Sequence, residues 1–378
     1  MENKIKIVAD DAIPFLKGVL EPFADITYEN GASITNAMLQ NAKALFIRTR
    51  TEANEELLKN TSVEFIATAT IGTDHLDEIY LNKNHITWTN AVACNANSVL
   101  QYIIAAVFHI IQKEHLKFSE ITLGIIGVGN IGSRIRDFFK MLGVKILCSD
   151  PPLKAKDKNF TDTPLQEIYK NADIITFHTP YIQAGPFKTF HLCDTSSFEM
   201  MKPSAWIINA SRGAVVDNKS LESALKENKI RGAVLDVFEN EPNVNQEFIN
   251  LLEIATPHIA GYGLDGKSNA TSIIVREFAN YFHIGALNHF EICLPEIKEP
   301  LTFEFSKTDT PEKIFYEIFK QTYDIHKESE KFKQDISKFE FLRKNYPVRR
   351  EPFAYRLQGK NIPESILHVL KLSGFSVL

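Results

Sequence analysis

The sequence predicts an α/β protein in which helices cover parallel sheets. Short apolar runs of strand character alternate with helical patterns over about the first 260 residues, an order that is typical of parallel sheets. One of these strands leads through a glycine-rich turn directly into a helix, as doubly wound folds require. From about Asn288 the composition shifts towards Lys, Glu and Phe, which indicates a further region.

The first ninety residues predict a small α/β region. Strands are expected at Lys4–Ala9, Ala44–Ile47 and Val63–Ala67, and helices at Phe15–Phe23 and Asn54–Leu58. Because strands and helices alternate, we expect a parallel sheet with crossover helices.

A long helix is expected next, over Val99–Ile111. Ser98 and Gln101 fit an S-x-x-Q capping box at its start. The run is apolar on nearly every face, so we expect this helix to be buried between layers and to join the first region to the second.

The second region predicts a doubly wound sheet, because strands and helices repeat after the glycine turn. The strands are expected at Ile121–Ile126, Lys145–Ser149, Ile174–His178, Ala205–Asn209, Ala233–Val237 and Glu253–Thr256. The helices are expected at Ile131–Met141, Leu165–Lys170 and Lys219–Glu227, and a helix over Ser268–Phe282 leads the chain out. Beyond it, Phe315, Phe319, Tyr323 and Phe332 lie on helical spacings and predict a helix-rich C-terminal region.

Composition disfavours several classes of function. With 44% hydrophobic and 24% charged residues, the chain can build a sizeable core. A net charge of -5 and a pI of about 6.2 disfavour a general binder of nucleic acid or anionic membranes. The start MENKIKIVAD does not resemble a signal peptide, and the most apolar stretch, Tyr102–Ile111, is too short to cross a bilayer.

The cysteines predict neither a zinc site nor a disulfide framework. Cys94, Cys148, Cys193 and Cys293 are widely scattered and contain no C-x-x-C pair. We therefore expect a cytoplasmic protein with no metal, no nucleic-acid partner and no membrane.

The segment from Leu123 to Gly132 carries the pattern G-x-G-x-x-G between a strand and a helix. Gly127 permits the tight turn, Gly129 lets a pyrophosphate approach the backbone, and Gly132 lets helix and strand pack closely. The helix N-terminus then favours the phosphates. Asp150 ends the next strand, where an acid bonds the adenine ribose and repels the extra phosphate of NADP. We predict a Rossmann-type NAD site; the alternative is an ordinary glycine turn with Asp150 as a surface cap.

Three further strands end in residues suited to oxidising an alcohol. Arg212, Glu241 and His258 each follow a strand, and ligands of open α/β sheets bind beyond the carboxyl ends of the strands. His258 is a base for the hydroxyl proton, Glu241 stabilises the protonated histidine, and Arg212 holds a carboxylate bidentately. Taken singly, each has a plainer explanation: a surface ion pair, a turn residue before proline, and a structural histidine.

With these motifs in view, the chain resembles the D-isomer-specific 2-hydroxyacid dehydrogenases. The resemblance covers about the first 290 residues and includes His178-Thr179-Pro180, NASRGAVVD, LDVFENEP and TPHIAG. It implies the same roles for Arg212, Glu241 and His258. The NAD contacts that it and the glycine motif predict are Gly127, Gly129, Asn130, Ile131, Gly132, Asp150, Thr179, Ala210, Ser211, Asp236 and Gly261.

The resemblance also implies three domains. A flavodoxin-like substrate-binding (lid) domain takes residues 1–96 and part of 262–287, with the two long helices as hinges. The Rossmann domain takes residues 97–261, and an α+β domain over residues 288–378 forms a homodimer. Within the family, the stretches ATATIGTDHLD and FLRKNYPVRRE are similar to a branch with such an extra dimerisation domain.

That branch implies a substrate, 4-phospho-D-erythronate, oxidised at its 2-hydroxyl during pyridoxal 5'-phosphate biosynthesis. Thr49, Thr70 and Tyr262 become expected substrate contacts, although plain turn chemistry explains the first two nearly as well. The alternatives are another 2-hydroxy acid, such as phosphoglycerate, lactate or glyoxylate, and a non-catalytic NAD sensor related to corepressors. Intact Arg212, Glu241 and His258 disfavour the sensor.

The C-terminal basic cluster, defined as Arg343, Lys344, Arg349 and Arg350, allows two interpretations. Such a cluster is usually a solvated helix end. The sharper hypothesis is that one or two of its arginines reach the active site of a neighbouring subunit and hold the substrate phosphate. Nucleic-acid binding is a weaker interpretation, because both signs of charge mix over Lys307–Glu340.

Overall fold

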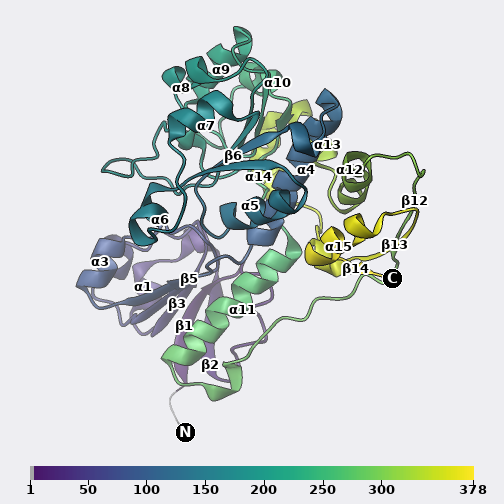
Figure 1. Ribbon diagram of the computed structural model, residues 1–378. Helices are drawn as coiled ribbons and strands as arrows, with labels where there is room; N and C mark the ends of the chain where they lie inside the picture. Colours follow the sequence, from purple (N-terminus) through teal and green to yellow (C-terminus); the bar gives the residue numbers. More distant parts are fainter. Residues whose placement is uncertain (1–3) are drawn as a thin grey trace. The chain divides into compact units, whose positions relative to one another are not determined.

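A computed structural model describes residues 4–378, and the chain divides into two compact units. Unit 1 contains the chain up to Asn95 together with Leu264–Pro295, and unit 2 contains Ala96–Gly263 and Glu296–Leu378. Figure 1 labels many of the helices and strands of both units. Within the described residues, no helix has the length and apolar character needed to cross a membrane.

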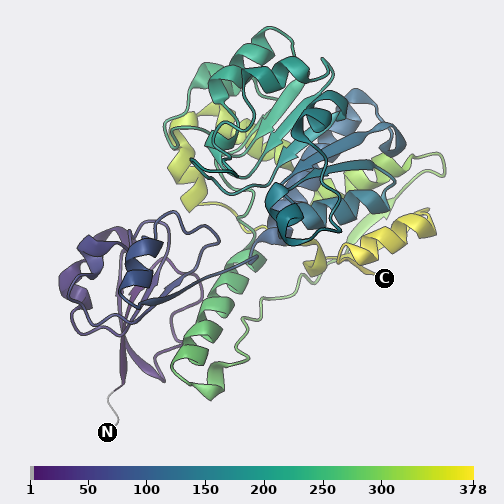
Figure 2. The same cartoon turned by 60° about the vertical axis from the view of Figure 1, so that its left-hand side comes forward.

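Unit 1 is a five-stranded parallel sheet in the strand order of flavodoxin-like folds, β2-β1-β3-β4-β5. Its strands are β1 (Ile5–Asp10), β2 (Ala24–Glu29), β3 (Ala44–Ile47), β4 (Phe65–Thr68) and β5 (Thr87–Asn90). Its helices are α1 (Asn36–Leu39), α2 (Glu55–Leu58), α3 (Glu78–Lys83) and α11 (Leu264–Tyr281). Helix α11, green in Figure 2, packs on the sheet through Phe278, whose ring lies 5.4 Å from that of Phe46.

One helix predicted in unit 1 is wrong. Residues Phe15–Phe23 form successive turns, because Phe15 and Gly18 have φ of 63° and 87°, which a helix cannot contain. Leu16 and Leu20 are nevertheless fully buried, so their apolar spacing reflects the core and not a helix. The strands β2 and β5 went unpredicted, because neither has a continuous apolar face.

Unit 2 contains a six-stranded parallel sheet in the order β11-β10-β9-β8-β6-β7. Its strands are β6 (Thr122–Ile126), β7 (Lys145–Ser149), β8 (Ile174–Phe177), β9 (Trp206–Asn209), β10 (Gly232–Leu235) and β11 (Ile254–Ala255). Its helices up to Gly263 are α4 (Ala96–Glu114), α5 (Gly132–Met141), α6 (Pro151–Lys156), α7 (Leu165–Asn171), α8 (Thr195–Met200), α9 (Asn218–Lys226) and α10 (Gln246–Leu251). The doubly wound fold predicted from the repeat is confirmed, and its strand order reverses between β6 and β8, where such sheets bind ligands.

Helix α4 is buried as predicted, but the capping box at its start is wrong. The helix begins at Ala96, so Ser98 and Gln101 lie inside it and not at its cap. Ser98 Oγ donates to Glu351 Oε1 at 2.5 Å, and Gln101 Nε2 donates to Thr322 Oγ1 at 3.2 Å. These polar side chains therefore tie the helix to the C-terminal residues.

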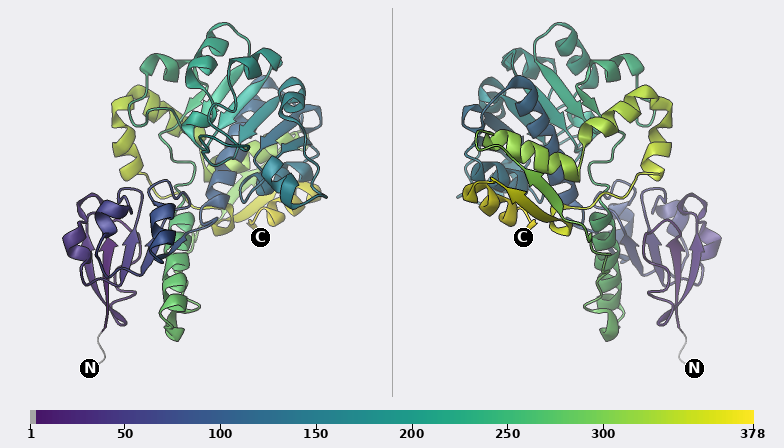
Figure 3. Two further views of the ribbon diagram at one scale, coloured as in Figure 1. Left: turned by 90° about the vertical axis from the view of Figure 1, so that its left-hand side faces the viewer. Right: turned by 90° about the vertical axis from the view of Figure 1, so that its right-hand side faces the viewer.

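The C-terminal residues of unit 2 add four helices and a three-stranded sheet. The helices are α12 (Pro311–Thr322), α13 (Ile325–Gln334), α14 (Phe339–Lys344) and α15 (Glu364–Leu372), and the strands are β12 (Leu301–Glu304), β13 (Arg356–Lys360) and β14 (Ser376–Val377). Phe108 of α4 meets Phe315 and Phe319 of α12 at 6.0 and 5.5 Å, within one continuous core. Figure 3 shows these lime and yellow segments against the rest of unit 2. The three-domain division stays a prediction.

Candidate active site

The three residues predicted to act on the alcohol follow three neighbouring strands. Arg212 follows β9, Glu241 follows β10 and His258 follows β11, and these strands are adjacent in the parallel sheet. Parallel strands end at one edge, so the sheet brings the three segments together.

His258 and Glu241 form a hydrogen-bonded pair. The Nδ1 of His258 lies 2.7 Å from Glu241 Oε2, and both side chains are partly exposed. His258 has φ of 57°, which is uncommon for any residue except glycine, and its backbone N–H donates to the carbonyl of Asp236 at 2.8 Å. The carboxylate accepts from Nδ1–H and thereby fixes the tautomer, so Nε2 is the nitrogen left to exchange a proton.

Glu241 stays ionised in this pair. Burial alone would raise its pKa, but the hydrogen bond and charge of His258, with the N–H of Phe238 donating at 2.7 Å, lower the pKa of the carboxyl below its ordinary value. An ionised Glu241 favours the protonated form of the histidine. The pair can therefore accept a proton at Nε2 and stabilise the charge that results.

Asp236 supports the turn that carries His258. One carboxylate oxygen accepts from Thr256 Oγ1 at 2.6 Å and from Ile259 N at 2.8 Å, and the other accepts from Ala260 N at 2.8 Å. Burial raises the pKa of Asp236, which is 1% exposed. Tyr102 of α4 lies 2.8 Å from Thr256 Oγ1 and extends the network. The contact of Asp236 with NAD stays a prediction.

Arg212 lies at the start of the short 3-10 helix η3 (Gly213–Val215), packed against the loop that carries Glu241. A Cβ on Gly213 would come within 2.0 Å of the Phe238 carbonyl, so only glycine allows this approach. Ser211 donates from N and Oγ to Asn209 Oδ1, which shapes the turn before Arg212. The guanidinium is partly exposed, with Nη1 donating to its neighbour's carbonyl, the Ser211 oxygen, at 2.9 Å.

The glycine turn fits a dinucleotide. Gly127 has φ of 88°, and a Cβ there would lie 2.6 Å from the carbonyl oxygen of His178. A Cβ on Gly132 would meet the Gly127 carbonyl at 2.0 Å, whereas nothing lies within 4 Å of one on Gly129. The backbone at Gly129 is therefore open to a pyrophosphate, with Asn130 and Ile131 leading into α5.

Two polar groups beside this turn also suit a cofactor. Asp150 follows β7 and accepts from Val128 N and Leu153 N, each at 2.8 Å. Thr179, after β8, has a buried hydroxyl oxygen without a hydrogen-bond partner among the described residues. The ends of β7 and β8, on either side of β6, thus bring a carboxylate and a hydroxyl group to the glycine turn.

We expect Asp150→Asn to weaken the preference for NAD over NADP by about tenfold or more, which corresponds to roughly 1.4 kcal/mol. The amide keeps one acceptor for the backbone but removes the charge that repels the 2'-phosphate. The measurement is kcat/KM with each cofactor. An unchanged ratio would show that Asp150 acts only as the cap of α6.

The predicted substrate contacts lie in different units. Thr49 is exposed after β3 in unit 1. Thr70 is also in unit 1, where its Oγ1 donates to the Gly72 carbonyl at 2.9 Å and lies 2.8 Å from Thr68 Oγ1. Tyr262 is in unit 2, with the Arg343 guanidinium 5.7 Å from its ring centre and Tyr346 in edge contact at 6.0 Å.

Two arginines of the C-terminal basic cluster make contacts within their own chain, and for Arg349 these correct the expectation of a solvated helix end. Arg349 is 5% exposed, donates to the Ala260 carbonyl and lies over the Tyr323 ring at 4.4 Å. Arg343 lies over Tyr262. Burial would lower its pKa, but its interactions with Tyr262, Glu340 and Glu241 raise the pKa above the ordinary value. Arg349 is therefore a buried residue, whereas Arg343 lies at the end of α14 with its side chain partly exposed. A long-range contact such as the one between Arg349 and Ala260 leaves no local signal in a sequence. The contact with a neighbouring subunit stays a prediction.

We expect Arg349→Ala to lower the free energy of unfolding by about 2–5 kcal/mol, because it opens a cavity and leaves the Ala260 carbonyl without its donor. Chemical denaturation measures the change. Lys344→Ala, at an exposed position of the same cluster, is the control and should change stability by less than about 0.5 kcal/mol. Equal stability of the two variants would contradict a structural role for Arg349.

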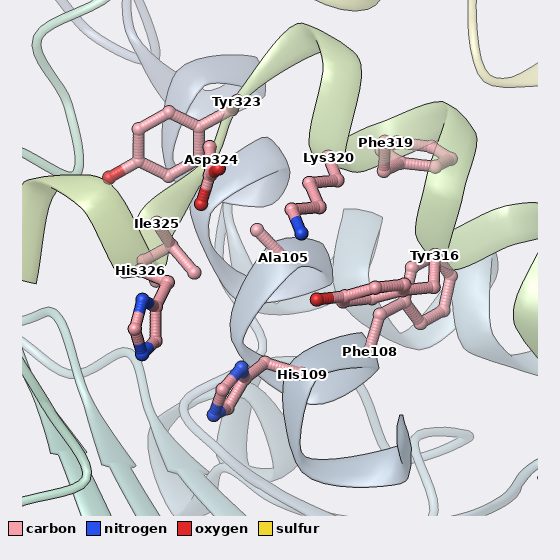
Figure 4. A pocket seen from close by; sticks show the side chains of 10 residues that line it. All are labelled: Ala105, Phe108, His109, Tyr316, Phe319, Lys320, Tyr323, Asp324, Ile325 and His326. Carbon is pink, nitrogen blue, oxygen red and sulfur yellow. The ribbon is translucent and has the colours of Figure 1, made fainter. Parts of the chain in front are cut away.

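A pocket elsewhere in unit 2 is not a substrate site. Figure 4 shows it between α4 and the junction of α12 and α13, where His109 and His326 stack at 5.8 Å. It has room for about 10 Å³, on the order of one water molecule. His109 Nε2 is paired with Glu253 Oε1 at 2.8 Å, so this nitrogen already has a partner within the chain.

Comparison with known proteins gives two family matches. The NAD-binding domain of D-isomer specific 2-hydroxyacid dehydrogenases matches residues 107–260. A domain of unknown function (DUF3410) matches residues 299–371. The first match spans the glycine turn and the segments of Arg212, Glu241 and His258.

Full-length relatives and solved structures agree with these matches. An erythronate-4-phosphate dehydrogenase of Bacteroides fragilis is 40% identical over 93% of this chain and 99% of its own. One from Acinetobacter baumannii is 36% identical over 92% of this chain and 98% of its own. The structure of a D-lactate dehydrogenase from Aquifex aeolicus, complexed with NAD and lactic acid, aligns with a TM-score of 0.59 at 25% identity, covering 74% of this chain and 97% of that one.

Proposed function

The chain belongs to the erythronate-4-phosphate dehydrogenases within the D-isomer-specific 2-hydroxyacid dehydrogenases, and we propose that it oxidises 4-phospho-D-erythronate with NAD. The product is 3-hydroxy-2-oxo-4-phosphooxybutanoate, formed with NADH and one proton, in pyridoxal 5'-phosphate biosynthesis. The observation that supports this proposal is the His258–Glu241 hydrogen bond. The two residues follow strands β11 and β10, next to the strand that precedes Arg212, in the sheet that also contains the strand before the glycine turn.

The reaction needs a base, a hydride acceptor and a fixed substrate. His258 Nε2 takes the proton of the 2-hydroxyl, and Glu241 stabilises the imidazolium that results. Arg212 holds the substrate carboxylate with its planar guanidinium and thereby orients the carbon that loses hydride. Bound NAD supplies the hydride acceptor. In the reverse direction the protonated histidine returns the proton to the carbonyl oxygen.

The turns at Gly127–Gly132, Thr179 and Ala210–Ser211 would hold the cofactor, with Gly261 following the histidine turn. Thr49, Thr70 and Tyr262 would contact the substrate. Support for Tyr262 comes from Arg343 and Tyr346, which fix its ring. Support for Thr70 comes from the hydrogen bonds that fix its hydroxyl.

We further propose a cytoplasmic homodimer formed through residues 288–378. This region exposes a group of large apolar side chains that a partner copy would cover: Phe341 60%, Val348 72%, Phe353 49%, Leu372 59% and Leu378 66%. Sedimentation of the purified chain tests the dimer. Deleting residues 288–378 would remove part of the core of unit 2. Substituting charged residues for Val348 and Leu372, and measuring sedimentation again, is therefore the better test of the dimer.

A substrate panel tests the activity. The chain is supplied with NAD and 4-phosphoerythronate, 3-phosphoglycerate or lactate, and NADH is followed by absorbance. We expect 4-phosphoerythronate to give the highest kcat/KM. A higher value with another acid would assign a different substrate to the same machinery, whereas no NADH from any acid would favour a sensor.

A further inference from the structure

His191 stands between two carboxylates of unit 2. Its Nε2 lies 2.5 Å from Glu239 Oε1, and its Nδ1 lies 3.6 Å from Asp217 Oδ2. The Phe190 ring stacks on the imidazole with 3.9 Å between centroids. His191 also has φ of 49°, in the left-handed region that few residues other than glycine adopt. The imidazole is therefore hydrogen-bonded to Glu239 at one edge, lies near the Asp217 carboxylate at the other, and is stacked on one face.

One histidine and two carboxylates could also be a set of cation ligands, but the orientation of the imidazole does not favour a shared metal ion. A cation binds one nitrogen of an imidazole, whereas the two nitrogens of His191 face different carboxylates. Asp217 already accepts from two backbone N–H groups at the start of α9, and Glu239 accepts from Asn218 N at 3.3 Å. Both carboxylates therefore already accept hydrogen bonds from groups of their own chain, and the hydrogen bond between His191 and Glu239 needs no metal.

Glu239 belongs to the loop that carries the partner of His258. It lies two residues before Glu241, and its backbone N–H donates to Asn218 Oδ1 at 3.0 Å. In the same loop, the N–H of Phe238 donates to Glu241 Oε1. An anchor on the Glu239 carboxylate therefore also holds the backbone segment from which the Glu241 side chain reaches His258.

The backbone of His191 contacts the neighbouring catalytic segment. Its N–H donates to the carbonyl of Ala214, two residues after Arg212, at 2.8 Å. The loop leading to His191 from Thr179 is closed by Thr189, whose hydroxyl donates to the Pro180 carbonyl at 2.6 Å. His191 thus connects the loop on the cofactor side to the segments of both Arg212 and Glu241.

We propose that His191 is a positioning residue of the dehydrogenase. Through Glu239 it holds the Phe238–Glu241 loop, defined as these four residues, at the position where Glu241 meets His258. The inference rests on the proposed function for its kinetic consequence, but the positioning itself is a property of the protein without substrate. Its absence should lower turnover more than it alters the binding of substrate or cofactor.

Hydrogen exchange tests the positioning without any substrate. In His191→Ala, the amides of Phe238 and Glu239 should exchange about tenfold faster, because the loop loses its anchor. His109→Ala is the matched control: it removes a histidine that is also paired with a carboxylate, Glu253, outside the catalytic loops. That variant should leave exchange in the Phe238–Glu241 loop unchanged. Exchange that is equally slow in all three proteins would overturn the proposal, whichever substrate the enzyme uses.

Kinetics test the consequence, with the acid that the panel selects. His191→Ala should lower kcat by about 10- to 100-fold, since a displacement of about 1 Å at a catalytic group costs up to 10²-fold. The KM for the acid and the Kd for NADH should change less than about threefold. The acidic limb of the pH profile should move to lower pH, because a displaced Glu241 favours the protonated histidine less.

A conservative variant separates positioning from folding. His191→Gln keeps one N–H donor for Glu239 and should recover at least part of the lost kcat, and it carries the test if the alanine variant does not fold. A loss of kcat with an unmoved pH profile and no rescue by glutamine would contradict the proposal. Failure of every acid in the panel would defeat the proposed function and leave the exchange result standing.

Discussion

His258→Gln should lower kcat for oxidation by about 10²- to 10⁴-fold, the contribution expected of a positioned general base. Glutamine keeps a polar side chain of similar length but cannot take up the hydroxyl proton. Glu241 keeps its bond from the Phe238 N–H, so the loop should stay in place. NADH binding, measured by fluorescence, should remain within about threefold of the original protein, because the glycine turn lies after a different strand.

The control for this variant must share its backbone conformation. His283 has φ of 58°, close to the 57° of His258, and is exposed at the surface of unit 1. His283→Gln therefore repeats the replacement of a histidine in a left-handed conformation without touching the site. Turnover by His258→Gln close to that of His283→Gln would eliminate the histidine as the base.

The pair also predicts how activity depends on pH. Oxidation needs the imidazole neutral, so the rate should fall on the acidic side as the histidine takes up a proton. Glu241→Gln removes the charge that favours the imidazolium, so the acidic limb should move to lower pH while the maximum rate declines. If the acidic limb of the pH profile lies at the same pH in the original protein and in Glu241→Gln, the limb reports the titration of a group other than His258.

The parts of this site that the sequence predicts are those with a local cause. The positive φ of Gly127 and the close approach of Gly132 to the Gly127 carbonyl both arise within one short turn. The strand β7 likewise has the predicted bounds Lys145–Ser149. Arg212 and His258 were predicted to lie near each other because parallel strands end at one edge. That rule depends only on the order of elements and not on the packing of side chains.

The parts that escaped prediction depend on contacts across long stretches of chain. Ser98 resembles a cap until Glu351 is seen to occupy its hydroxyl, 253 residues away. Arg349 resembles a surface charge until Tyr323 and Ala260 enclose it. The sequence assigns no role to His191, and only the fold places it between Asp217 and Glu239. Polar residues that become buried through tertiary contacts have the same sequence spacing as exposed polar residues, so the sequence alone does not distinguish the two.

Arg212→Gln should lower kcat/KM for the hydroxy acid by about 10³-fold, or roughly 4 kcal/mol, within the range for removing one partner of a hydrogen-bonded charge pair. The amide cannot offer two parallel donors and a positive charge to a carboxylate. Arg212→Lys keeps the charge but not the planar fork, so its loss should be intermediate. Both variants should bind NADH as before.

Arg231→Gln is the matched control, because this arginine also adjoins a strand, β10, yet forms an exposed pair with Glu114 at 3.0 Å. It should change kcat/KM by less than about twofold, since a surface pair of this kind contributes about 0–1 kcal/mol to stability and nothing to substrate binding. A kcat/KM that falls stepwise from arginine through lysine to glutamine at position 212, with no such fall at Arg231, would indicate that the planar guanidinium binds the substrate carboxylate with two parallel hydrogen bonds. Equal losses for lysine and glutamine would mean that geometry alone matters, and no loss would place the carboxylate elsewhere.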